Sequence, residues 1–218
     1  MTYNNIYTYT MSLFTLVSAY MVMADPAEIT TPFMIYTCLF YVFATDLVSG
    51  LLHIVLDNKR SLEIPVIRPL AEGFQRHHIN PKNIYQMSWY KHIFGIHLPL
   101  TFLFVVVLIV NSPKLYFSYV SLVLFMHLMQ MSHRWSHTPV SMLSKPVILL
   151  QKMRILLTRK AHGVHHNGIY DSNFCIFNGY MNPLLNKLTT VFNRESHGWV
   201  FVFVISTIAM LICPIWFS

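Results

Sequence analysis

Residues 29–57 read ITTPFMIYTCLFYVFATDLVSGLLHIVLD, and this stretch decides how the rest of the chain is organised. Up to Leu56 it carries a single charge, and it exceeds the ~20 residues that an α-helix needs to cross a bilayer. Four residues near its end recur at spacings of four, three and four, which place them on one helix face: Asp46, Gly50, His53 and Asp57. The stretch predicts a membrane-spanning helix that ends in a polar stripe.

Three further stretches, 93–111, 115–132 and 198–218, carry no Asp, Glu, Lys or Arg and are near the length of a span. A fifth uncharged stretch, 7–24, is shorter and more polar, and a signal peptide is its competing interpretation. No Lys or Arg precedes Lys59, so the basic start of a signal peptide is missing and we favour a span.

The composition of the 218 residues agrees with a membrane protein, because 55% are hydrophobic and only 11% are charged, against about 25% charged in soluble domains. A disordered tail, a fibrous repeat and an ordinary cytosolic enzyme are excluded. The net charge of +7 does not indicate a nucleic-acid partner, because the basic residues form no solvated arm. We therefore predict an all-α, multi-pass helical membrane protein with four or five transmembrane helices.

The basic residues predict the orientation of these helices. Six of the fifteen Lys and Arg lie in 57–91 and eight in 133–197, whereas the 25–28 link carries only acidic charges. By the positive-inside rule both long loops are cytosolic, and five spans then place the N-terminus inside. We expect three regions along the chain: 1–30 with the first span, 31–197 as the core, and 198–218 with the last span.

Local signals predict smaller features of the loops. Pro69 opens a short helix that runs to His78, and Pro81 stops it. The stretch 146–157 is apolar but too short to span, so it is expected as an interfacial helix. The cysteines are odd in number, far apart and without a CxxC pair, which argues against disulfides and a cysteine zinc site: Cys38, Cys175 and Cys213.

Histidine is the unusual residue of this chain, with 12 His against 8 Asp and Glu. Eight of them form four clusters at the expected cytosolic ends of the spans: His53; His77 and His78; His133 and His137; and His162, His165 and His166. Spacings of three and four residues aim imidazoles from one helix face at a shared ion. The other four are expected to be structural: His92, His97, His127 and His197.

Eight neutral ligands exceed what one ion needs, so two ions with open positions are expected. Iron is favoured over zinc, because only a redox metal gives such a site a use for two ions and few carboxylates. Asp46 and Asp57 are predicted to orient imidazoles rather than to bind metal. The alternative for Asp46 is a polar contact between packed helices. Trp135 and Tyr180 are expected as interfacial anchors.

The clusters stand in four motifs, followed by a fifth: Asp46-Leu-Val-Ser-Gly-Leu-Leu-His53 with Asp57; Phe74-Gln-Arg-His77-His78-Ile-Asn-Pro81; His133-Arg-Trp-Ser-His137-Thr; His162-Gly-Val-His165-His166; and Asn173-Phe-Cys175-Ile-Phe-Asn-Gly179. In this order they resemble the plasmanylethanolamine desaturase, or Kua, family of lipid desaturases. The plant plastid desaturase that acts on the palmitate of phosphatidylglycerol belongs to the same family. The resemblance runs from about residue 41 to 188 and identifies 31–197 as a lipid desaturase domain.

The resemblance implies a di-iron membrane oxidase that takes O2 and two electrons and removes two hydrogens from a phospholipid chain. Its eight histidine ligands match the eight clustered histidines one to one, and no catalytic side chain is implied beyond them. Asn173 joins Asp46 and Asp57 as a candidate for orienting the ligands. Two positions depart from the family pattern: Ile54 stands where Trp is frequent, and Tyr170 where the animal enzymes have a further His.

Several functional alternatives stay open. Conversion of plasmanylethanolamine to plasmenylethanolamine, a vinyl ether, is favoured over desaturation of a fatty-acyl chain on phosphatidylglycerol or hydroxylation of a lipid. A non-enzymatic metal-binding or metal-transport protein is the distant alternative. The chain carries no dinucleotide, flavin or haem-attachment motif, so electrons are expected from an external cytochrome b5 or ferredoxin that docks on the basic cytosolic face. The membrane would be the endoplasmic reticulum of a eukaryote or the inner membrane of a bacterium.

Overall fold

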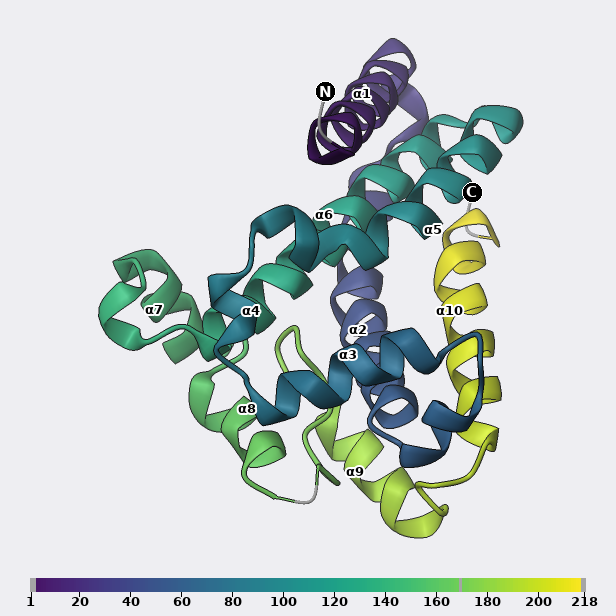
Figure 1. Cartoon of the computed structure of the whole chain (residues 1–218). Helices are drawn as coiled ribbons and strands as arrows, with labels where there is room; N and C mark the ends of the chain where they lie inside the picture. Colours follow the sequence, from purple (N-terminus) through teal and green to yellow (C-terminus); the bar gives the residue numbers. More distant parts are fainter. Residues whose placement is uncertain (1–2, 169, 217–218) are drawn as a thin grey trace. The chain divides into compact units, whose positions relative to one another are not determined.

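The computed structural model describes residues 3–168 and 170–216, and in that part of the chain every regular element is a helix (Figure 1). The long helices are α1 (Tyr3–Ala24), α2 (Thr31–Leu56), α5 (Trp89–Val110), α6 (Pro113–His137) and α10 (Gly198–Trp216). The short ones are α3 (Arg68–Ile79), α4 (Asn83–Gln86), α7 (Lys145–Lys152), α8 (Arg159–His166) and α9 (Asn182–Val191). The predicted all-α class is confirmed. The side chain of Cys213 lies outside the described residues.

Each stretch that the sequence marked as apolar forms one long helix. The largest boundary difference is in α6, which ends at His137 rather than at Ser132. Two helices in the described part, α2 and α6, are both long and apolar enough to cross a membrane. The apolar parts of the other three are shorter: 9–24, 95–110 and 198–212. The number of spans therefore stays a prediction.

The described residues group into two compact units that interleave along the chain. One unit draws on 1–42, 88–127 and 209–218, and the other on 43–87 and 128–208. All eight clustered histidines lie in the second unit, which is consequently the unit that carries the candidate site. The division into 1–30, 31–197 and 198–218 remains a prediction.

The first unit is held together by aromatic packing between apolar helices. The rings of Phe14 in α1 and Phe104 in α5 stack with centroids 4.1 Å apart. The hydroxyl of Tyr119 in α6 donates to the Leu100 carbonyl at 3.3 Å, which joins α6 to α5. His127 also belongs to this unit, and its Nδ1 donates to the Val123 carbonyl one turn earlier at 2.7 Å. It therefore stands apart from the eight clustered histidines.

The second unit has a hydrophobic core built around the C-terminal half of α2. Its buried members come from α2, α3, α9, α10 and the loop before α9: Leu51, Ile54, Val55, Leu56, Ala71, Phe174, Cys175, Leu185 and Trp199. In α2 the core residues 51 and 54–56 lie between the positions of the polar stripe, 46, 50, 53 and 57. The ends of α2 and α3, which carry three of the clustered histidines, are thereby fixed on a common core.

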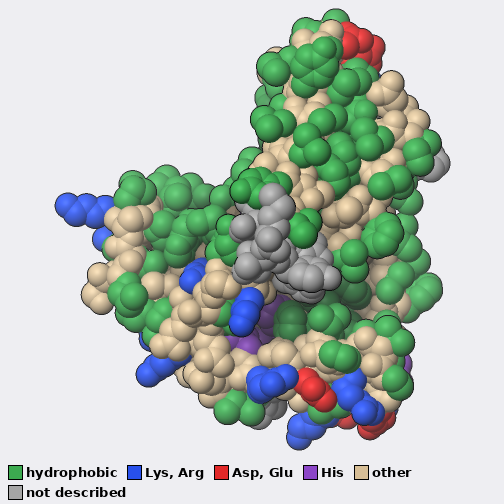
Figure 2. Space-filling model, turned by 45° about the horizontal axis from the view of Figure 1, so that its top comes forward, with side chains coloured by type: hydrophobic (Ala, Val, Ile, Leu, Met, Phe, Trp, Pro, Cys, Tyr) green, Lys and Arg blue, Asp and Glu red, His purple; other side chains and the backbone are tan. Residues whose placement is uncertain are grey.

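The interfacial helix expected over 146–157 is shorter than predicted. α7 ends at Lys152, because Arg154 adopts a left-handed backbone conformation with φ of 59° that an α-helix does not allow. Leu149 and Met153 expose more than half of their side-chain surface, and Lys152 lies beside them in the chain. Figure 2 shows apolar and basic side chains together on the lobe that contains α7.

Gly50 allows α2 to lie directly against the loop before α9. A Cβ atom at this position would collide with Cδ1 of Leu185 and would stand 2.7 Å from Sγ of Cys175. Both neighbours are fully buried core residues, so neither has room to move away. The close approach brings the polar stripe of α2 onto the loop that supports the histidines of α8.

We predict that Gly50→Ala lowers the thermal unfolding midpoint of the purified protein, because an added methyl group overpacks this contact at a cost of about 1–3 kcal/mol. Gly73→Ala is the matched control, since Gly73 also lies in a helix but has no atom within 4 Å of the added methyl. Alanine favours the helix there, so this variant should be as stable as the parent or more so. Equal midpoints for the two variants would contradict the prediction.

Candidate metal centre

Four helices of the second unit bring the eight clustered histidines together. α2 contributes His53, α3 His77 and His78, α6 His133 and His137, and α8 His162, His165 and His166. Their rings form a continuous network of neighbours with centroids about 4.6–6.5 Å apart, linking all four helices. Six of the eight are buried, and His137 and His166 are half-buried.

Local signals explain why each helix presents its histidines at this place. α3 begins with Pro69 in its first turn and ends before Pro81, which leaves its adjacent His pair in the last turn. α8 begins at Arg159 and is capped by Thr158, whose hydroxyl accepts a hydrogen bond from the Ala161 amide at 3.0 Å. In α8, His165 and His166 follow His162 by three and four residues, so the three side chains lie on one side of the helix.

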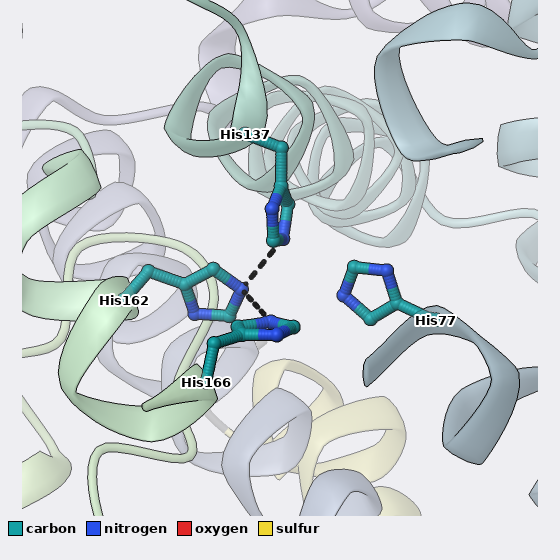
Figure 3. A group of neighbouring side chains, drawn as sticks. All are labelled: His77, His137, His162 and His166. Atoms are coloured by element: carbon teal, nitrogen blue, oxygen red, sulfur yellow. Dashed lines mark hydrogen bonds between the residues drawn. The ribbon is translucent and has the colours of Figure 1, made fainter. Parts of the chain in front are cut away.

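The first group of ligands consists of His77, His137, His162 and His166, which offer ring nitrogens within 4.8 Å of one another. Figure 3 shows His77 pointing at the other three from a separate helix. Nε2 of His162 lies 2.9 Å from Nε2 of His137 and 3.1 Å from Nε2 of His166. His133 adjoins the group through an Nε2–Nε2 distance of 3.2 Å to His137.

Hydrogen bonds alone do not satisfy this arrangement. A neutral imidazole nitrogen carries either one proton or one lone pair in the ring plane. Nε2 of His162 faces two neighbouring nitrogens at once, so it can pair with only one of them. A cation at the centre would instead accept a lone pair from every ring. Metal–nitrogen bonds of about 2.1 Å imply nitrogen–nitrogen separations of about 3.0–3.4 Å around a shared ion, close to the observed distances.

His77 gives independent support for a metal. Its ring is buried, and neither Nδ1 nor Nε2 has a hydrogen-bond partner. Nδ1 of His162 and Nδ1 of His166 are likewise buried without a partner. Buried nitrogens are normally bonded, and leaving one unpaired costs about 1–3 kcal/mol. The residues therefore fit a metal ion better than they fit a purely structural cluster.

The second group consists of Asp57, His78 and His165, all buried. Oδ1 of Asp57 lies 2.8 Å from Nε2 of His78, and Oδ2 lies 3.2 Å from Nε2 of His165. Nδ1 of His165 donates to the Ser172 carbonyl at 2.9 Å, which directs Nε2 toward Asp57. Nε2 of His165 and Oδ2 of Asp57 are both buried without a hydrogen-bond partner. A cation between them could bind both atoms.

His53 is prepared in the same way. Its Nδ1 donates to the Ser49 carbonyl at 3.0 Å, and its buried Nε2 has no partner. Imidazoles that bind metals commonly donate their other nitrogen to a backbone carbonyl, which fixes the tautomer. The His53 ring lies 5.6 Å from that of His165 and 5.8 Å from that of His133, so its lone pair is directed toward the ligand groups.

The protonation states of the loop residues suit cation binding. Burial, followed by the neighbouring imidazoles, holds the pKa of His77 and His162 far below the usual value, so both rings are neutral at pH 7. Burial opposes the ionisation of Asp57, but the contacts from His165 and His78 outweigh it and hold the pKa of this carboxyl below its usual range. The site therefore presents neutral lone pairs and one carboxylate.

Asp46 contacts backbone amides of the loop before α9. Its Oδ1 accepts backbone N–H bonds from Phe177, Asn178 and Gly179 at 3.1–3.2 Å, and Oδ2 accepts from Met181 at 3.0 Å. Among the described contacts of this carboxylate none is to an imidazole. Asp46 orients the loop before α9, because that loop turns back on itself and leaves four amides without helical partners.

Asn173 supports α8 from the same loop. Its Nδ2 donates to the Ala161 carbonyl at 3.2 Å, next to His162, and its Oδ1 accepts from Asn186 of α9 at 3.1 Å. The residue has a φ of 56°, a left-handed conformation that Asn tolerates better than most residues. The predicted orienting role thus acts through the backbone of α8 and not on an imidazole directly.

Two supporting residues were not found from the sequence. Arg134 donates three hydrogen bonds, at 2.7–3.1 Å, to the backbone carbonyls of Ile84, Tyr85 and Met87, which fixes the chain after α3. Ser132 accepts from the Leu157 amide at 2.9 Å and so holds the segment that leads into α8. Each of them is adjacent to His133, and that proximity was the only signal in the sequence.

Tyr170 lies against the second ligand group. Its ring centroid is 4.0 Å from that of His78, and its backbone is left-handed with φ of 56°. Arg194 donates to its carbonyl at 2.7 Å and so stabilises this conformation. The residue that departs from the animal sequences is therefore in contact with a candidate ligand.

Comparison with known protein families matches the lipid desaturase domain over residues 41–201, most of the chain. The chain belongs to this lipid desaturase family. The match contains all eight clustered histidines, so the resemblance that the four motifs suggested is confirmed. No solved structure matches the chain.

Relatives from plants, bacteria and animals match the same region. The protein named fatty acid desaturase 4-like 1, chloroplastic, of Arabidopsis thaliana is 36% identical over 149 residues, which cover 67% of this chain and 50% of the relative. Plasmanylethanolamine desaturase of Myxococcus xanthus is 29% identical over 154 residues, or 66% of this chain and 53% of the relative. Plasmanylethanolamine desaturase 1 of Mus musculus is 28% identical over 165 residues, or 70% and 60%.

The chain spans about half the length of the first of these curated relatives. The family match over 41–201 contains every residue of the candidate metal centre.

We predict two metal ions per chain, one for each ligand group. His77→Ala should remove one ion and leave the other, because His77 belongs only to the first group, and His165→Ala should do the reverse. The double variant should hold none. Metal content of the purified protein, measured by mass spectrometry, tests this, with the exposed His197→Ala as control. One ion in the parent protein would contradict the two-site arrangement.

We also predict that Asp46→Asn lowers the thermal unfolding midpoint, by the equivalent of about 3 kcal/mol, because an amide nitrogen replaces one of the two oxygens that accept buried N–H bonds. Hydrogen exchange of the 177–181 amides should become faster. Asp25→Asn is the matched control, since the exposed Asp25 side chain makes no capping hydrogen bond. If the two variants exchange these amides at the same rate, Asp46 does not hold the loop.

Proposed function

We propose that this protein is a membrane di-iron lipid desaturase, which uses O2 to remove two hydrogens from a phospholipid chain. The observation that carries the proposal is the convergence of buried imidazole lone pairs into two adjacent ligand groups. Membership of the lipid desaturase family supports the same activity. The first iron would be held by His77, His137, His162 and His166, and the second by Asp57, His78 and His165. His133 lies beside rings of the first group, and His53 lies beside His133 and beside His165 of the second group.

The choice of iron follows from the reaction. An unactivated methylene has no acidic proton, so acid–base side chains cannot break its C–H bond, and bound iron would supply the oxidising power from O2. The overall balance is that the lipid gives up two protons and two electrons, an external donor gives two electrons, and two further protons are taken up from solution. O2 accepts the four electrons and leaves as two waters.

The side chains of this protein have supporting roles in that reaction. The bonds from His53 to Ser49 and from His165 to Ser172 keep both rings in one tautomer, with Nε2 free to bind. Burial keeps water away from His77 and His162, so their lone pairs stay available to a cation. Asp57 contributes the single negative charge of the two groups, which makes them unequal.

The favoured substrate is plasmanylethanolamine, whose alkyl chain would become the vinyl ether of plasmenylethanolamine. The bacterial and animal relatives bear that activity in their names. A fatty-acyl desaturase is the second candidate, since the plant relative with the higher identity is named as a fatty acid desaturase. Tyr170, placed against His78, is the position at which this chain departs from the animal pattern.

The electron donor would be a cytochrome b5 or a ferredoxin, which are acidic carriers suited to a basic surface. Fourteen of the fifteen Lys and Arg lie in the two segments that contain the ligand groups, 57–91 and 133–197. By the positive-inside rule this face is cytosolic. The membrane would be the endoplasmic reticulum or a bacterial inner membrane, with four or five helices crossing it.

Lipid analysis of a cell that lacks vinyl ethers tests the proposal. We predict that expression of the chain produces acid-labile vinyl ethers, and that a variant carrying His162→Ala and His166→Ala produces none, because it lacks half of the first ligand group. A new acyl double bond without vinyl ethers would shift the assignment to the fatty-acyl candidate. If the intact chain and the variant give the same lipids, with a reduced donor present, the desaturase proposal is wrong.

A further inference from the structure

A cavity of about 970 Å³ opens beside the first ligand group. Its lining includes three of the four imidazoles of that group, His137, His162 and His166. The cavity lies wholly within the second unit, between α8, the end of α6 and the chain that follows α3. A volume near 1,000 Å³ is that of a site for a small molecule or part of a lipid.

The other side chains of the lining give the cavity a positive charge. Lys82, Arg159 and Lys160 line it, and none of the lining residues is Asp or Glu. Pro81 and Val164 are the lining residues with purely apolar side chains. Figure 2 shows Lys and Arg side chains near histidine atoms that reach the surface.

We propose that this cavity binds the phosphate of a phospholipid headgroup, through Lys82, Arg159 and Lys160, beside the first ligand group. The proposal rests on the proposed function, which it deepens by naming the group that anchors the substrate. Concave sites lined by one sign of charge concentrate the field and attract the opposite ion. Arg and Lys are the side chains that bind phosphate best.

The position of the cavity agrees with this occupant. In a plasmanyl phospholipid the carbons that become the vinyl ether are those next to the glycerol, only a few bonds from the phosphate. An anchored phosphate would therefore hold these carbons close to the imidazoles that line the same cavity. An acidic electron carrier is the competing occupant of a basic surface, but a protein docks over a broad area of about 800 Å² and not inside a cavity of this size.

Gly163 offers a way to fill the cavity without changing a charge or a ligand. It lines the cavity between His162 and His166 in sequence, and a Cβ there would meet only Nδ2 of Asn167, at an ordinary contact distance of 3.8 Å. A larger side chain at this position would therefore project into open space. Gly163→Leu should occupy the cavity, whereas Gly163→Ala should leave most of it open.

Binding to the purified, metal-loaded full chain in neutral detergent tests the proposal. The probes are a short-chain phosphatidylethanolamine, the diacylglycerol with the same chains, and inorganic phosphate. We expect the variant with Lys82→Gln, Arg159→Gln and Lys160→Gln to bind the phospholipid about tenfold more weakly and the diacylglycerol unchanged, since three exposed charge contacts together are worth about that factor. Metal content should not change, because no ligand is altered.

The control for net charge is a variant with Lys59→Gln, Arg76→Gln and Lys187→Gln, which also loses three positive charges of the second unit, none of which line the cavity. It should bind the phospholipid like the parent. Gly163→Leu should weaken phospholipid binding about tenfold at unchanged metal content, and Gly163→Ala by less than twofold. Equal weakening by the control, or no effect of Gly163→Leu, would overturn the proposal.

Two further outcomes separate this proposal from its alternatives. If inorganic phosphate binds through the same three cations more tightly than the phospholipid does, the site serves free phosphate and the headgroup assignment is wrong. If the cation variant slows reduction by cytochrome b5 while lipid binding is unchanged, the surface docks the donor and the proposal is again wrong. The two proposals can also fail separately. If the parent protein forms no double bond but the cation variant still loses phospholipid binding, the headgroup site stands and only the desaturase proposal is rejected.

Discussion

The structure of the second unit depends on buried imidazole nitrogens that converge without enough protons to bond one another. Nε2 of His162 faces two other Nε2 atoms, His77 has two unpaired buried nitrogens, and Nε2 of His165 faces a carboxylate oxygen. Such a set is unfavourable without a cation that accepts the lone pairs, and this supports the proposed metal centre. The apolar core beneath α2 and the close contact at Gly50 supply the rigidity that holds these rings together.

The supporting polar network is directed at backbone rather than at imidazoles. Asp46 binds four amides of the loop before α9, Asn173 binds the backbone of α8, and Arg134 binds three carbonyls after α3. α8 carries three of the clustered histidines, and the other two segments follow α8 and α3, which carry them as well. Fixing the backbone fixes several rings at once, and the remaining freedom of two rings is removed by the carbonyls of Ser49 and Ser172.

Much of this was predictable from residue patterns, and the rest was not for identifiable reasons. The apolar stretches and the i, i+4 histidines depend on local helix geometry, so the long helices and the convergence of the eight histidines followed from the sequence, whereas their role as metal ligands stays a prediction. α7 ended early because Arg154 adopts a left-handed conformation, which no pattern signals. The partners of Asp46 lie more than 130 residues away in the chain, and those of Arg134 about 50 away. Contacts at such separations are set by tertiary packing, so a stripe on α2 could show that Asp46 was buried but not what it would bind.

The two ligand groups differ in charge, and this difference bears on how a substrate is oriented. The first group consists of four imidazoles, so a divalent ion held there would keep its full positive charge, whereas Asp57 would cancel part of the charge of an ion in the second group. The basic cavity is lined by imidazoles of the first group and by none of the second. With both proposed ions bound, the field of the cations and that of the more positive ion would add in the same space and favour an anion there. The second group would then face a less polar part of the ligand. The asymmetry created by a single carboxylate would thus give an amphipathic substrate a direction.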